Sequence, residues 1–194
     1  MADALALIEL DSVARGLRAL DLLVKKAPVE VLEGNLVEPG KFLILYAGDV
    51  AEVEESHAEA LEYAEGGVLD QMLLPFAHPH LLRGLKGHQE TRSASGYDCL
   101  GVIEGSAVAS TLHAADRSLK DAEVTLAGVR IAGGLGGRAY YVVFGYQHDV
   151  EAAVEAGRDV LQAAGTHHHS ELIPRPHEDM VGWLLRPAPF RVGS

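Results

Sequence analysis

The stretch IELDSVARGLRALDLLVKKA, residues Ile8–Ala27, occurs a second time as IEGSAVASTLHAADRSLKDA, residues Ile103–Ala122. The two copies lie 95 residues apart and share nine of 20 aligned residues, whereas unrelated segments would share about one. The chain therefore contains an internal repeat. Because a repeat determines how a fold is divided, the rest of the sequence is best interpreted from it.

Each copy of the repeat predicts a strand followed by an amphipathic helix. A short apolar run with an Ile-Glu pair comes first, and Ser12 is placed to cap the first helix. Apolar residues then recur at helical spacing on one face. In the two copies these are Val13, Leu17, Leu20 and Val24, and Val108, Leu112, Ala115 and Leu119.

The repeat continues beyond these helices. Two β-rich runs follow in each half, the stronger ones being FLILYA (42–47) and AYYVVF (139–144), now 97 residues apart. The connecting loop is VEPGK (37–41) in the first half and the longer AGGLGGR (132–138) in the second. A second helix and a last apolar run then lead into PFAH (75–78) and PRPH (174–177), 99 residues apart.

Each half thus predicts strand, helix, strand, strand, helix, strand and short helix, which is an α/β sandwich with helices covering a mixed sheet. Antiparallel neighbours are expected inside each half. The predicted domains are residues 1–86 and 98–186, joined by a polar linker at 87–97 and followed by a C-terminal tail at 187–194.

Composition narrows the class of protein. The net charge of −12 argues against nucleic acid as a partner, and no apolar run is long enough to span a membrane. The start of the sequence lacks the basic flank of a signal peptide, and the single cysteine, Cys99, fits a reducing cytoplasm. We therefore expect a soluble cytoplasmic protein.

Taken in order and repeated twice, these motifs resemble the shell proteins of bacterial microcompartments. Two such domains in one chain, each beginning with the Ile-Glu strand, are similar to the unpermuted, tandem-domain, trimer-forming class. The resemblance implies two ferredoxin-like α/β sandwich domains and a pseudohexameric homotrimer. It also implies a non-enzymatic tile that joins hexameric and pentameric shell proteins, lies in the microcompartment shell and passes small metabolites through a central pore.

The resemblance places the pore at the loop before the third strand of each half. The implied pore residues are Val37, Glu38, Pro39, Gly40, Gly133, Gly134, Leu135 and Gly136. Some tandem members carry a cysteine where Glu38 stands and use it to hold an iron–sulfur cluster. Because cluster ligands must be thiolates, no cofactor is expected here, and Cys99 is expected to be a buried structural thiol. Three copies of Glu38 would form an acidic constriction that repels anions, although a solvated turn residue is the alternative.

The resemblance also implies residues at the tile edge, where neighbouring tiles meet. Lys25 and Lys120 occupy matching places near the ends of the repeated helices, where the helix dipole alone would also favour a solvated lysine. Arg175 and His177 match the other half of the edge motif, and His78 is the counterpart of His177. In the first half Phe76 stands in place of the arginine.

Other signals for chemistry are weaker. The run His167-His168-His169 is expected to be an exposed loop, because three successive histidines cannot face one metal ion. The glycines at 133–137 lack the spacing of a phosphate-binding loop. No catalytic set and no metal site are therefore predicted. The alternative function is a tandem α/β sensor or enzyme subunit that binds a small ligand or metal.

Overall fold

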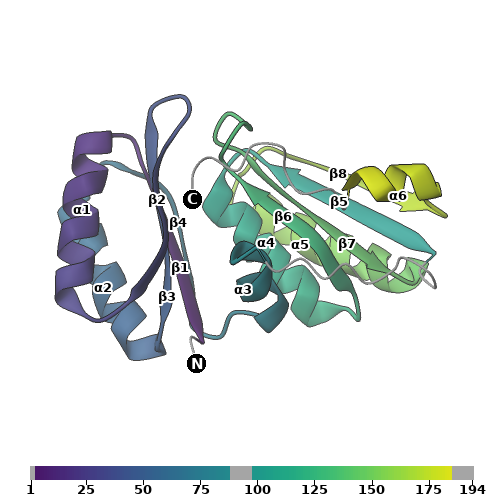
Figure 1. Ribbon diagram of the computed structural model, residues 1–194, viewed down its shortest axis with the longest axis horizontal. Helices are drawn as coiled ribbons and strands as arrows, with labels where there is room; N and C mark the ends of the chain where they lie inside the picture. Colours follow the sequence, from purple (N-terminus) through teal and green to yellow (C-terminus); the bar gives the residue numbers. More distant parts are fainter. Residues whose placement is uncertain (1–2, 88–97, 185–194) are drawn as a thin grey trace.

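The computed structural model describes residues 3–87 and 98–184, which form two four-stranded sheets with their helices (Figure 1). Each sheet follows one copy of the repeat. The first copy comprises β1 (Ala4–Leu10), α1 (Val13–Lys26), β2 (Glu30–Val37), β3 (Lys41–Gly48), α2 (Val50–Tyr63), β4 (Val68–Leu74) and α3 (Pro79–Leu85). The second comprises β5 (Cys99–Gly105), α4 (Val108–Asp121), β6 (Thr125–Ile131), β7 (Ala139–Gly145), α5 (Gln147–Ala163), β8 (His168–Pro174) and α6 (Glu178–Leu184).

The order of elements confirms the predicted unit, but the prediction of a mixed sheet was wrong. The strand orders are β2-β3-β1-β4 and β6-β7-β5-β8, and every neighbouring pair is antiparallel. The reason lies in the crossovers. Each long helix connects two strands that run parallel, but a third strand, antiparallel to both, lies between them.

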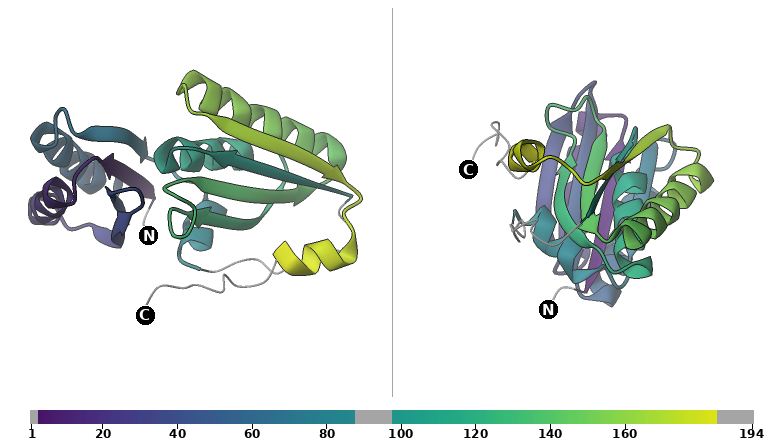
Figure 2. Two further views of the ribbon diagram at one scale, coloured as in Figure 1. Left: turned by 90° about the horizontal axis from the view of Figure 1, so that it is seen from above. Right: turned by 90° about the vertical axis from the view of Figure 1, so that its right-hand side faces the viewer.

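The elements stack in layers along the long axis of the molecule (Figures 1 and 2). Helices α1 and α2 cover the outer face of the first sheet, and α4 lies between the two sheets. Helix α4 packs against β4 and β1 on one side and against α5 and its own sheet on the other. It therefore joins the two halves, together with α3, which packs against β6.

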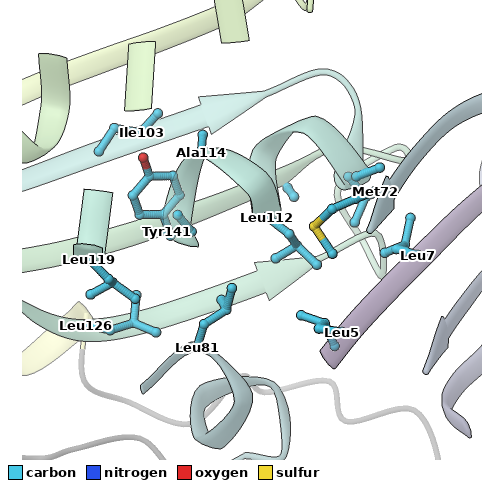
Figure 3. Close-up of a cluster of buried hydrophobic side chains, with 14 of the residues drawn as sticks. Leu5, Leu7, Met72, Leu81, Ile103, Leu112, Ala114, Leu119, Leu126 and Tyr141 are labelled. Atoms are coloured by element: carbon cyan, nitrogen blue, oxygen red, sulfur yellow. The ribbon is translucent and has the colours of Figure 1, made fainter. Parts of the chain in front are cut away.

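Strand β1 shows how the two halves share a core. All of its residues are buried, because both of its faces are covered. Ile8 and its same-face neighbours pack against α1 and α2. Leu5 and Leu7 point to the opposite face of the sheet. There they join Met72 of β4 and Leu112 of α4 in a cluster that extends through the second half (Figure 3). Each fully buried aliphatic side chain in this shared cluster stabilises the fold by about 1.5–3 kcal/mol, so the two halves stabilise each other.

The predicted linker (87–97) lies almost wholly outside the described residues, as does the tail (187–194). Within residues 3–87 and 98–184, no helix is long and apolar enough to span a bilayer.

Candidate functional site

The two loops that carry the predicted pore residues lie next to each other. The first, residues 38–40, contains a cis Glu38–Pro39 peptide, and Gly40 has a positive φ of 106°. The second, residues 132–138, also reverses through residues with positive φ. A Cβ atom on Gly137 would lie 2.6 Å from the carbonyl oxygen of Glu38. Only glycine permits this approach, so the longer loop of the second domain is built to pack against the first.

The predicted pore residues fall into two groups by solvent exposure: buried or half-buried residues at the base of the loops, and exposed residues at their tips. Val37 is buried and Leu135 is half-buried, which anchors the two loops. The remaining predicted residues are exposed: Glu38, Pro39, Gly40, Gly133, Gly134 and Gly136. Glu38 thus presents a free carboxylate at the tip of one loop, while the neighbouring loop presents mostly backbone.

Glu9 joins the two domains by a contact that the sequence did not reveal. Its side chain is only 2% exposed, and Oε1 accepts the backbone N–H of Val108 at 2.5 Å and of Ala109 at 2.9 Å. Lys41 Nζ lies 3.3 Å from Oε2. A carboxylate at a helix N-terminus is favoured by the dipole and by the unpaired N–H groups there. Burial nevertheless raises the pKa of Glu9.

Asp70 of β4 is the second residue of the first domain that binds the N-terminus of α4. Its Oδ2 accepts from the backbone N–H of Ser110 at 3.0 Å and from the Ser110 hydroxyl at 2.6 Å. Ala107, the residue before the helix, has no side chain able to cap it. The first domain therefore supplies the cap that α4 lacks. A charged residue inside an apolar strand, as at Glu9, is the signal in the sequence that points to such a contact.

The predicted edge lysines lie in different surroundings. Lys25 is exposed and pairs with Asp21 at 2.6 Å, which lowers the pKa of that aspartate. Lys120 pairs with Asp116 at 2.5 Å, but Asp116 is buried and also accepts the backbone N–H of His78 at 2.7 Å. His78 therefore contributes to the contact between the domains through its backbone, and Lys120 pairs within α4 with the aspartate that makes this contact, which the sequence did not predict.

Arg175 and His177 both lie at the surface. Arg175 has a φ of 48°, and its backbone N–H donates to the carbonyl of Asp98 at 2.6 Å. His177 Nδ1 accepts the N–H of Asp179 at 3.3 Å, as His78 Nδ1 does from the N–H of His80. The two PxxH segments thus start their short helices in the same way, and only the second is fully exposed.

The prediction of an exposed loop at His167-His168-His169 was right for His167, which precedes β8 and is exposed, but wrong for His168 and His169. His168 and His169 begin β8, opposite Gly105 and Glu104 of β5, because their backbone completes the ladder at that end of the sheet. The rings of His167 and His169 have centroids 4.9 Å apart, and Nδ1 of His168 lies 2.9 Å from the carbonyl oxygen of Thr166. No group of three or more possible metal ligands occurs in the part of the chain that is described. Cys99 is buried, as predicted, and burial raises its pKa.

A fold of this topology, repeated in one chain with two hairpin loops in contact, defines a tandem α/β domain protein. The BMC domain family matches residues 4–77 and 99–176. The chain belongs to this family and carries its domain twice.

The similar proteins are named as shell components. The chain is 36% identical to the bacterial microcompartment shell protein PduT of Citrobacter freundii over 93% of this chain and 96% of that one. Shell protein EutM of Salmonella typhimurium is 35% identical over 83 residues, which is 43% of this chain and 84% of that protein. A microcompartment protein from Desulfitobacterium hafniense has a crystal structure with a TM-score of 0.81 and 34% identity, covering 93% of this chain and 98% of that chain. These relatives favour a structural role over an enzymatic one.

Proposed function

We propose that this chain is a structural tile of a bacterial microcompartment shell. Three copies form a pseudohexagonal ring in which six domains surround a central pore for small metabolites. The tile joins hexameric and pentameric shell proteins, is not an enzyme, and lies in the cytoplasm as part of the shell.

The observation that carries the proposal is the contact between the two hairpin loops. Two domains of one family lie side by side in one chain, and their corresponding loops meet, with Gly137 against the backbone of Glu38. If further copies continue this arrangement around an axis, six loops surround one opening. Glu38, Pro39 and Gly40 would then alternate with the tip formed by Gly133, Gly134, Leu135 and Gly136. The exposed Glu38 carboxylates would make the opening acidic.

The edge of the tile is proposed at Lys25, Arg175 and His177, which are exposed and therefore free to contact a neighbouring tile. Lys120 and His78 belong to the same proposal, but both also contact the buried Asp116. A charge reversal at Lys120 would place two carboxylates together at the domain boundary and would test folding as well as assembly. Lys25 and Arg175 are therefore the better positions for a test.

The experiment measures mass and assembly separately. Wild type should have about three times the chain mass of 20.7 kDa by sedimentation and should form sheets or shells with partner tiles. The double variant Lys25→Glu with Arg175→Glu should remain a trimer but lose assembly, since edge contacts act through repetition over the lattice. Glu54→Lys, an exposed charge reversal on α2, is the control and should assemble. A wild-type chain that stays monomeric at micromolar concentration contradicts the proposal.

A further inference from the structure

The histidine run at the start of β8 brings two imidazole rings together in the folded chain. His168 and His169 begin the strand, and the backbone N–H of Ser106 donates to the carbonyl of His167 at 2.9 Å, which continues the pairing with β5 by one residue. The backbone is therefore extended through all three histidines. Because alternate residues of an extended chain point to the same face, His167 and His169 share a face, and their ring centroids lie 4.9 Å apart.

This separation fits two ligands of one metal ion. With nitrogen–zinc distances of about 2.0–2.1 Å and tetrahedral angles, two imidazoles bound to one ion have centroids about 5 Å apart. The middle histidine makes a different contact, since Nδ1 of His168 lies 2.9 Å from the carbonyl oxygen of Thr166. Three successive histidines cannot face one ion, but the first and the third of an extended run can.

The surroundings of the two rings leave room for an ion. Both histidines are exposed, and they line a small hollow together with Glu104 and Arg138. The hollow has a volume of about 10 Å³, which is the space of about one water molecule or ion. Glu104 lies opposite His169 in the ladder, and its carboxylate favours a cation there, whereas the Arg138 guanidinium opposes one. These two charges offset each other, so the imidazole nitrogens determine what binds.

We propose that His167 and His169 form a binding site for one divalent transition-metal ion of the class that imidazole prefers, which comprises Zn²⁺, Ni²⁺ and Cu²⁺. No group of three possible metal ligands occurs in residues 3–87 and 98–184, so the chain supplies two ligands and water completes the coordination. The affinity should be greatest for Cu²⁺, as is general for nitrogen ligands. This binding function is separate from the proposed role as a tile.

The test measures metal binding to the full chain by calorimetric titration with Cu²⁺ and with Zn²⁺. Wild type should bind one ion per chain. His167→Ala and His169→Ala should each weaken the affinity by about 100-fold, because the second ring no longer binds intramolecularly. His168→Gln is the matched control within the same run, and it should keep the wild-type affinity. Electron paramagnetic resonance of the Cu²⁺ form should show two nitrogen ligands in wild type and one in each alanine variant.

The two charged neighbours sharpen the test. Glu104→Gln should weaken the affinity several-fold and Arg138→Gln should strengthen it, since the first removes a favourable charge and the second an unfavourable one. All variants should keep the circular dichroism spectrum of wild type. Equal affinity in wild type and both alanine variants would overturn the inference, because no pair of rings would then hold the ion. A loss in His168→Gln as large as that in His167→Ala would also overturn it, and neither result would affect the proposed tile, which is tested by mass and assembly.

Discussion

Helices α1 and α4 come from the two copies of the repeat, yet one is largely exposed and the other is the centre of the molecule. Leu112 of α4 is completely buried, and its counterpart Leu17 is 56% exposed. Their apolar spacing is the same. The difference shows that the sequence of a helix defines the face that needs a partner, while the neighbouring chain or domain decides whether that face is filled.

The largest expected effect comes from shortening the buried member of this pair. Leu112→Ala should lower the free energy of unfolding by about 2–5 kcal/mol, because it opens a cavity between the two sheets. Leu17→Ala should change the stability of the dilute chain by no more than about 0.5 kcal/mol. Urea denaturation followed by circular dichroism measures both values.

Protein concentration separates the two helices further. If α1 is covered by another copy, the stability lost in Leu17→Ala should grow as the protomer concentration rises, since assembly stabilises the folded chain by mass action. The loss in Leu112→Ala should be present at every concentration. Equal losses at high dilution would show that the two helices do not differ in the way their exposure indicates.

A second comparison concerns α2 and α5. His57 of α2 is buried between Tyr46, whose hydroxyl lies 2.5 Å from Nδ1, and Gln71, whose Oε1 lies 2.7 Å from Nε2. The corresponding residue of α5 is Val154, which is also buried. Burial lowers the pKa of His57, so folding disfavours the protonated ring. The first domain therefore has a titratable group in its core where the second has an apolar one.

This difference predicts a dependence of stability on pH. Because the pKa of His57 is lower in the folded chain, the unfolded chain binds more protons, and stability should fall as the pH drops from about 7 to about 5. Burial also lowers the pKa of His78, which acts in the same direction. His57→Gln should reduce the slope of unfolding free energy against pH while keeping a polar group in the site. An unchanged slope in that variant would assign the effect to the other histidines.

The repeat made most of the fold predictable. A helical period of apolar residues and the β-rich runs located the long helices and the eight strands of the described residues, because these patterns depend on local sequence. The mixed sheet was a wrong prediction, since strand order is set by which elements pack together rather than by any one segment. His168 and His169 were likewise assigned to a loop, although pairing with Gly105 and Glu104 makes them part of a strand.

The contact between the domains could not be predicted from the sequence for the same reason, because it depends on which elements pack together. Glu9 and Glu104 repeat identically, and only the register of β1 against β4 and the position of α4 show that Glu9 receives a helix. Lys120 resembles Lys25 in the sequence, but the buried Asp116 gives it a different role. Residues that act across the domain boundary can be found in the sequence as charged positions that repeat in both halves. Identifying the residues that they contact requires the three-dimensional structure.

The smallest expected effect on stability, and the most specific one on function, concerns the two pore loops. Glu38 is exposed at the tip of one loop, whereas the other has glycines at the corresponding place, so the negative charge of the proposed pore comes from the first domain alone. Glu38→Gln should change the unfolding free energy by no more than about 0.5 kcal/mol, but it should increase the flux of a small anion into assembled shells several-fold by removing the like charges at the constriction. Glu33→Gln, an exposed substitution on the strand that leads to this loop, is the control and should leave the flux unchanged. Equal flux in wild type and Glu38→Gln shells would show that the carboxylate lies away from the path, and the two loops would then differ in shape without differing in selectivity.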